Sequence, residues 1–147
     1  MRFCDLNRPP LDGVMPPMQN MVRLPRAAAW SCAIFLALVF VFAGMSKLQG
    51  PSAMRWSERF VNWGYPANAS YVIGVLETLA GLGVLIPNWR RAAAAMLVAL
   101  MIGALCTHAV HAEFPRLIPP VVLGGLAFLL YSARPREGAG SPQHRKS

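Results

Sequence analysis

Four long apolar segments, separated by short polar ones, dominate the pattern of this chain. They cover residues 27–46, 71–86, 92–110 and 117–133. The first contains 20 uncharged residues, which would extend about 30 Å as an α-helix at about 1.5 Å per residue. Each segment is therefore predicted to be a helix that crosses a bilayer, the second with little tilt because it has only 16 residues. A signal peptide is the alternative for the first segment, since Val41, Phe42 and Ala43 could form a cleavage site, but its apolar run is longer than such peptides usually carry.

The polar segment between the first two crossings has a pattern of its own. Pro51 and Ser52 are typical of a helix start, and Gly64 is typical of a helix end. Between them, apolar residues recur at spacings of three and four, at Ala53, Trp56, Phe60 and Trp63. This spacing indicates a short amphipathic helix that lies flat on the membrane surface. An ordinary loop is the alternative.

Small residues recur every four positions in the third crossing, at Ala95, Ala99, Gly103 and Thr107. Such a stripe lets another helix approach closely, so it predicts the packing face of this helix. Chance recurrence in an alanine-rich helix is the alternative.

Composition agrees with a membrane protein. Hydrophobic residues make up 55% of the chain, charged residues make up 14%, and the mean hydropathy is +0.41. The net charge of +8 does not indicate a nucleic-acid partner, because the Lys and Arg residues lie in the tails and between apolar segments. The three cysteines form no framework spacing and do not indicate a disulfide scaffold.

The expected fold is an all-α integral membrane bundle of four helices over residues 27–133, between a disordered tail at 1–26 and a basic disordered tail at 134–147. The two tails and the 88–91 turn hold ten Lys and Arg residues, against four on the other side of the membrane. By the positive-inside rule, both termini are predicted to be cytoplasmic. The Trp and Tyr residues fall near the two predicted membrane boundaries, as an aromatic belt requires.

Glu77 is a carboxylic acid inside the second apolar segment. Around it on the helix lie Ser70, Ile73, Gly74, Ala80, Gly81 and Val84, whereas the opposite face carries Val72, Val75, Leu79, Leu82 and Ile86. The apolar face suits lipid, and the small-residue face suits another helix. An ionisable group at this depth costs a few kcal/mol or more, so Glu77 is a candidate functional residue.

Three other ionisable groups are expected near the same membrane surface. Lys47 ends the first helix there, and Ala43 and Gly44 leave room for its side chain to bend toward Glu77. Outward extension of Lys47 to lipid headgroups is the alternative. His108 is a candidate hydrogen-bond or proton partner of Glu77, and His111 lies on the same face of the third helix; both could instead be ordinary interfacial histidines. No metal site is expected, because no second ligand pair accompanies these histidines.

Several short motifs resemble the DoxX-like family of small four-helix membrane proteins. They are Gly44 to Leu48 (GMSKL), Trp63-Gly64-Tyr65-Pro66, Gly74-Val75-Leu76-Glu77 followed by Leu85-Ile86-Pro87, and Thr107-His108. The likeness runs from about residue 27 to 132, and the proline-rich first 26 residues depart from it. It implies a prokaryotic inner-membrane protein, whose better understood relatives are small subunits of quinone-linked oxidoreductases or membrane partners in thiol and oxidative-stress systems. It also implies that Lys47, Glu77 and His108 form the functional polar set.

The sequence shows no soluble catalytic constellation, so any chemistry must come from a bound redox molecule or a partner subunit. The leading hypothesis is a small subunit that binds a quinone or relays protons near it, with a redox subunit or a second copy as partner. In that hypothesis Glu77 receives a proton or hydrogen bond, Lys47 is its counter-charge, and His108 and His111 are further polar contacts. One alternative is a non-catalytic assembly protein with a structural Lys47–Glu77 pair. A small transporter is the other, although four helices without an inverted repeat do not favour it.

Overall fold

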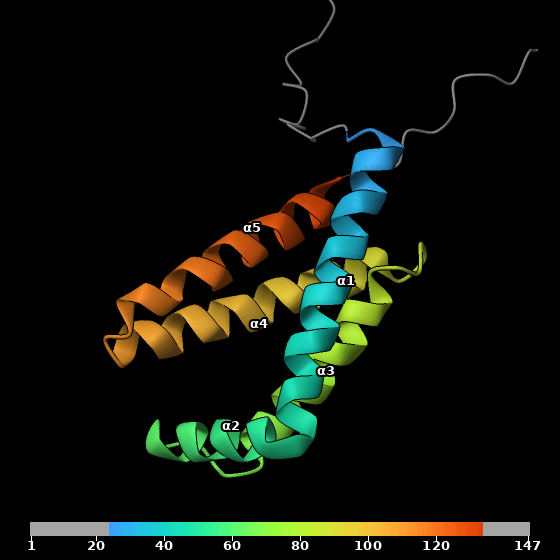
Figure 1. The fold of residues 1–147 in the computed structure, drawn as a ribbon. Coiled ribbons are helices and arrows are strands. Elements are labelled where there is room, and N and C mark those ends of the chain that lie inside the picture. The colour runs from blue at the N-terminus through green and yellow to red at the C-terminus, as the bar shows by residue number, and fades with distance from the viewer. Residues whose placement is uncertain (1–23, 134–147) are drawn as a thin grey trace, which may run out of the picture.

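The structure, a computed structural model, describes residues 24–133 as helices joined by short turns, with no strand in that range (Figure 1). The elements are α1 (Arg26–Leu48), α2 (Gly50–Asn62), α3 (Ala69–Gly83), α4 (Arg90–Val110), the 3₁₀ helix η1 (Phe114–Leu117) and α5 (Ile118–Ser132). The predicted all-α class is confirmed. The two predicted disordered tails lie outside the described residues, apart from the few positions before α1.

Three helical segments are long and apolar enough to cross a membrane: α1, α4, and η1 together with α5. The second predicted crossing, residues 71–86, corresponds to α3, which is apolar but shorter than the other three because it ends at Gly83. Beyond it the backbone forms tight turns, in which Leu85 N bonds to Leu82 O and Ile86 N bonds to Gly83 O, both at 3.1 Å. Pro87 prevents the helix from continuing through Ile86, since the residue before a proline avoids the helical conformation.

The helices form two pairs. α1 packs along α3, and α4 and α5 form a hairpin that crosses α1 at an angle (Figure 1). The predicted amphipathic helix is present as α2, which lies crosswise at the end of α1 and contacts both α1 and α3. Gly50 makes the corner between α1 and α2 with a φ of 72°, a left-handed conformation that favours glycine. The pair α1–α3 and the crosswise α2 together frame one end of the molecule.

α1 and α3 meet through glycines. A Cβ atom placed on Gly74 would lie 2.9 Å from the backbone oxygen of Gly44 and 2.9 Å from Lys47 Cβ. The face of α3 predicted to meet a helix is buried at Ser70, Gly74, Ala80 and Gly81, whereas Leu79 on the opposite face is 62% exposed. The two faces of α3 are therefore confirmed.

The small-residue stripe of α4 does not form its packing face, so that prediction is wrong within this chain. Ala95, Ala99 and Gly103 are exposed, and a Cβ atom on Gly103 would meet nothing within 4 Å. α4 instead buries Ala94, Leu97 and Met101, and the small partner is Gly124 of α5, where an added Cβ would lie 3.2 Å from Met101 Cβ. One small residue on one helix suffices for a close crossing, and here α5 supplies it.

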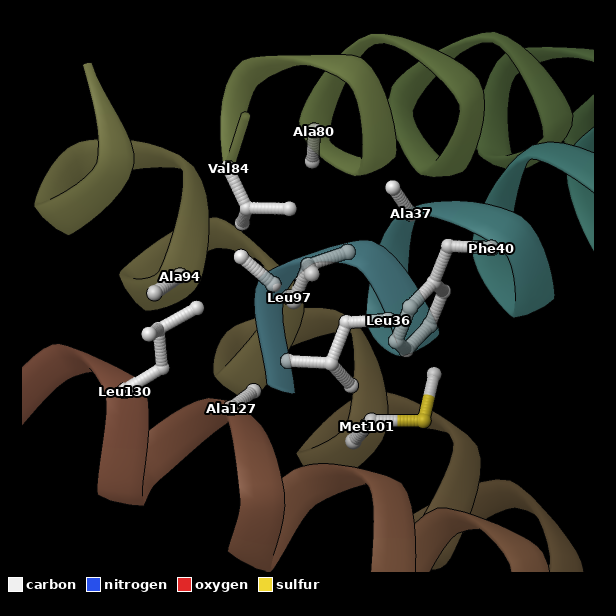
Figure 2. Close-up of a cluster of buried hydrophobic side chains, with 11 residues drawn as sticks. Leu36, Ala37, Phe40, Ala80, Val84, Ala94, Leu97, Met101, Ala127 and Leu130 are labelled. Carbon is white, nitrogen blue, oxygen red and sulfur yellow. The ribbon is translucent and has the colours of Figure 1, made fainter. Parts of the chain in front are cut away.

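A compact apolar core lies where the two helix pairs cross (Figure 2). Its largest fully buried side chains are Leu36 and Phe40 of α1, Val84 after α3, Leu97 of α4 and Leu130 of α5. Many large apolar side chains outside this core face outward, Phe42 at 79% exposure among them. Such a surface suits lipid and would not be stable in water.

Candidate functional site

Lys47 and Glu77 form an ion pair beside the glycine contact of α1 and α3. Lys47 Nζ lies 2.6 Å from Glu77 Oε2, and the two side chains expose only 8% and 7% of their surface. The predicted pairing is confirmed, and the alternative in which Lys47 extends to lipid headgroups is wrong. Each charge depends on the other, because removing one partner of a buried pair typically costs about 3–5 kcal/mol.

Two further contacts hold the Lys47 ammonium group. Nζ donates to the backbone oxygen of Ala43 at 3.3 Å, one turn earlier in α1. It also lies 4.6 Å from the ring centroid of Trp56 in α2, within the range of a cation–π interaction. α2 therefore contributes an aromatic face to the ion pair, which its amphipathic pattern alone did not reveal.

One carboxylate oxygen of Glu77 has no hydrogen-bond partner among the described residues. Lys47 bonds to Oε2, whereas Oε1 receives no hydrogen bond from any residue within 24–133. Oε1 is also not a fully buried atom, and Glu77 lines a cavity of about 500 Å³. This oxygen is therefore an acceptor that a ligand in the cavity can use.

The cavity lies at the end of the molecule that α2 covers, and all five α-helices contribute to its wall. Its volume falls within the range of about 300–1,000 Å³ that is usual for small-molecule sites. The wall is mostly apolar, with residues such as Phe40, Phe60, Ile73, Met101 and Leu123. Its few polar side chains include Lys47, Glu77, Thr107 and His108. A mostly apolar cavity with few polar groups suits a ligand that is itself mostly apolar.

His108 lines this cavity but does not bond to Glu77, so that predicted pairing is wrong. Its Nδ1 donates to Glu113 Oε2 at 2.8 Å, and Glu113 Oε1 accepts from Arg116 Nη1 at 2.8 Å. The turn after α4 brings Glu113 back over the helix end, so the Glu113 carboxylate, five residues along the chain, is the partner of His108 in place of Glu77. Burial raises the pKa of Glu113, but the hydrogen bonds from His108 and Arg116 outweigh it and hold the pKa below its ordinary value of 4.5. Glu113 is thus an anion at neutral pH.

His111 lies outside the cavity wall. Its Nδ1 donates to the backbone oxygen of Thr107 at 2.8 Å. The rings of His108 and His111 both contact Trp63, with centroids 5.4 and 5.7 Å from that of the indole. The two histidines share one helix face, as expected, and together hold Trp63 against α4.

A second polar link across the cavity was not predicted. Tyr65 lies 2.9 Å from Thr107 through their hydroxyl oxygens. Thr107 directs its own hydrogen to Gly103 O at 3.0 Å, so Tyr65 is the donor. The sequence pattern assigns Tyr65 to the aromatic belt and Thr107 to the small-residue stripe, and predicts no contact between them. The only signal was that both belong to motifs shared with one family.

Comparison with known proteins agrees with these motifs. A model of the DoxX-like family matches residues 31–130, which contain every residue of the site just described. The chain belongs to the DoxX-like family. No curated protein and no solved structure is significantly similar to it.

This DoxX-like protein is a membrane protein, and its polar groups limit the chemistry of the site. Within residues 24–133, no three His, Cys, Asp or Glu side chains gather in a way that could hold a metal ion. The cavity instead offers a carboxylate acceptor at Glu77, a cation at Lys47 and an imidazole at His108. With Nδ1 of His108 donating to Glu113, its Nε2 is an acceptor in the neutral ring and a donor in the charged ring. These groups can bind, orient and exchange protons with a ligand that has polar oxygens on an apolar frame.

Proposed function

We propose that this cavity binds the ring of a membrane quinone and that the protein is a small subunit of a quinone-linked redox system. The observation that carries the proposal is Oε1 of Glu77, an acceptor without a hydrogen-bond partner within residues 24–133, on a residue that lines a mostly apolar cavity of about 500 Å³. A quinol hydroxyl can donate to this oxygen while the ring packs on the apolar wall. The ion pair with Lys47 offsets part of the cost of a carboxylate there.

In this proposal each polar residue of the site has its own role. A quinone, when bound, would supply the carrier of two electrons and two protons. Glu77 would accept the hydrogen bond or proton of one ring oxygen, and Lys47 would balance the charge of the carboxylate. His108 would contact a second ring oxygen through Nε2. Electrons would pass to or from a partner subunit, since the residues of this cavity are not themselves redox groups.

The same proposal places the protein in the inner membrane of a prokaryotic cell, with both termini in the cytoplasm. Its support is the family, together with the excess of Lys and Arg in the tails and the 88–91 turn. The partner would be a redox subunit, which in a thiol or oxidative-stress system would bear the reactive centre.

Bound quinone is the first measurement. The protein is purified in mild detergent, loaded with ubiquinone or menaquinone, and the quinone retained per chain is quantified by solvent extraction. Replacing Glu77 with Gln removes the acceptor charge and should lower quinone retention about tenfold or more. Glu58→Gln is the matched control, because Glu58 is exposed on α2 and does not line the cavity. Equal retention by wild type and Glu77→Gln would contradict the proposal.

A second pair of variants covers the case in which Glu77→Gln fails to fold. Gly103 faces open space on the cavity wall, so Gly103→Leu should fill the cavity without disturbing the core. Ala95→Leu adds a similar side chain to the same helix, at an exposed position outside the cavity. Only Gly103→Leu should reduce quinone retention, and loss in both variants would point away from the cavity.

A structural role for the ion pair is the second candidate function, and its position at the closest contact of α1 and α3 favours it. In that case the double variant Lys47→Met with Glu77→Leu should keep or raise thermal stability, since well-packed apolar residues often replace a buried pair without loss. A stable double variant that still retains quinone would establish the pair as structural. A stable double variant that no longer retains quinone would support the binding proposal.

A further inference from the structure

A second pocket lies at the opposite end of the molecule from the ion pair. It has a volume of about 200 Å³ and forms where the start of α1, the turn before α4 and the end of α5 meet. Figure 1 shows the start of α1 close to the end of α5. Three arginines line this pocket: Arg26, Arg90 and Arg91. The remaining wall is apolar or aromatic, including Trp30 and Leu130.

The Arg90 side chain is held in place, but one of its nitrogen atoms has no hydrogen-bond partner within residues 24–133. Its Nε donates to the backbone oxygen of Val84 at 2.9 Å, and its guanidinium carbon lies 4.3 Å from the ring centroid of Trp30. Its Nη2, however, is fully buried and has no hydrogen-bond partner in the described part of the chain. A buried N–H without an acceptor is costly, so the hydrogen-bonding capacity of the Arg90 guanidinium is not fully used within residues 24–133.

The charges around this pocket are of one sign. The three acids within residues 24–133 are Glu58, Glu77 and Glu113, and the last two are paired at the other end of the molecule. None of the ion pairs within that range involves an arginine of the pocket. The first residues of α4 add their free backbone N–H groups beside Arg90, and these favour an anion. The pocket therefore concentrates positive charge without a protein anion among the described residues.

The chemistry of the ligand follows from the donors. A guanidinium presents paired N–H groups that match two oxygens of a phosphate. The Arg90 guanidinium is already held against the Trp30 ring, so its side chain loses little conformational entropy when a ligand binds. The pocket also lies at the ends of helices that span the membrane, next to Trp30 and with Tyr131 5.4 Å from the Arg91 guanidinium carbon. Aromatic rings at this level are typical of the interface, where lipid phosphates lie.

We propose that the pocket of Arg26, Arg90 and Arg91 binds the phosphate of an anionic phospholipid headgroup. The guanidinium groups of Arg26, Arg90 and Arg91 supply the donors and the positive charge for the phosphate, and the start of the acyl region lies against Leu130 and Ala29. The site is independent of the quinone cavity, because the two lie at opposite ends of the helices and share no lining residue.

Thermal unfolding in neutral detergent tests this site. Phosphatidylglycerol is added to the wild type, and phosphatidylcholine and inorganic phosphate are added in parallel at equal concentration. The expected result is a rise in Tm with phosphatidylglycerol alone. An equal rise with phosphatidylcholine would show that net negative charge is not recognised and would overturn the proposal. An equal rise with inorganic phosphate would assign the pocket to a free anion and overturn the lipid assignment.

Three variants locate the effect. Arg91→Gln removes a charge from the edge of the pocket, and Arg90→Lys keeps the charge but removes the paired donors. Each should weaken phosphatidylglycerol binding about tenfold in a titration of the Tm shift. Arg55→Gln is the matched control, since Arg55 is exposed on α2 at the other end. If Arg90→Lys is too unstable to measure, Arg91→Gln decides the matter, and unchanged lipid binding in that variant would overturn the proposal.

Discussion

Ala112 carries the most unusual backbone conformation among the described residues. Its φ is 54°, and no other non-glycine residue within 24–133 has a positive φ. The turn around it is a Schellman motif, in which Glu113 N bonds to His108 O at 2.9 Å and Ala112 N bonds to Ala109 O at 3.2 Å. This turn is what brings the Glu113 carboxylate to His108. The strained conformation of Ala112 thus positions Glu113, which in turn holds His108 in the cavity wall.

Replacing Ala112 with Gly should stabilise the protein by about 1 kcal/mol, because glycine adopts the left-handed conformation without the penalty of a Cβ atom. The measurement is thermal unfolding in detergent, in which the variant should melt higher than the wild type. Ala109→Gly, inside the last turn of α4, is the control and should melt lower, since glycine weakens a helix interior. A lower Tm for Ala112→Gly would mean that this turn is not formed.

At the scale of helices, Gly44 and Gly74 decide whether the ion pair can exist. Their backbones approach so closely that a Cβ on Gly44 would lie 2.6 Å from Gly74 O. Backbone atoms cannot move aside as a flexible side chain can. The distance between α1 and α3 therefore depends on the absence of a Cβ atom at both glycines. The Lys47–Glu77 contact depends on the same distance.

Gly74→Ala should separate α1 from α3 and destabilise the protein by about 1–3 kcal/mol, the usual cost of overpacking. It should also lower quinone retention, because Lys47 and Glu77 would no longer hold their positions at the cavity. Gly125→Ala provides the comparison, since a Cβ there meets nothing within 4 Å. That variant should be as stable as the wild type or more so. Similar behaviour of the two variants would show that the close approach is not needed.

The sequence predicted what depends on periodicity within one helix, and it failed where the answer lies in a neighbouring helix or in the conformation of a turn. The two faces of α3 and the reach of Lys47 toward Glu77 follow from residue spacing along single helices. By contrast, α4 does not pack through Ala99 and Gly103, because Gly124 of α5 already provides the close crossing. His108 lies at the depth expected for it but bonds to Glu113, because the turn at Ala112 was not visible in the residue pattern. The first case depends on tertiary packing and the second on the backbone conformation of a turn, and residue periodicity reports neither.

At the scale of the whole molecule, the two proposed sites lie at opposite ends of the helices. The ion pair and its cavity lie at the α2 end, and the arginine pocket lies where α1 starts and α5 ends (Figure 1).

α3 is too short to cross the hydrocarbon core of a bilayer by itself, because its 15 residues extend only about 22 Å, against about 30 Å for that core. The apolar turn residues after Gly83, such as Leu85 and Ile86, must therefore complete the crossing or the bilayer must become thinner around α3.

Cysteine labelling tests whether α3 crosses and in which direction. Asn68 and Asn88 are exposed residues that flank α3, so a single cysteine at either position, in a chain without Cys4, Cys32 and Cys106, reports one side of the membrane. A membrane-impermeant maleimide should label Asn68→Cys in intact cells and Asn88→Cys only after the cells are opened, because Arg90 and Arg91 favour the cytoplasmic side. Labelling of both positions from outside would mean that α3 does not cross, and the reverse order would invert the orientation proposed from charge. In that inverted case the arginine pocket would face the outer leaflet, and the leaflet in which anionic lipid is bound would change with it.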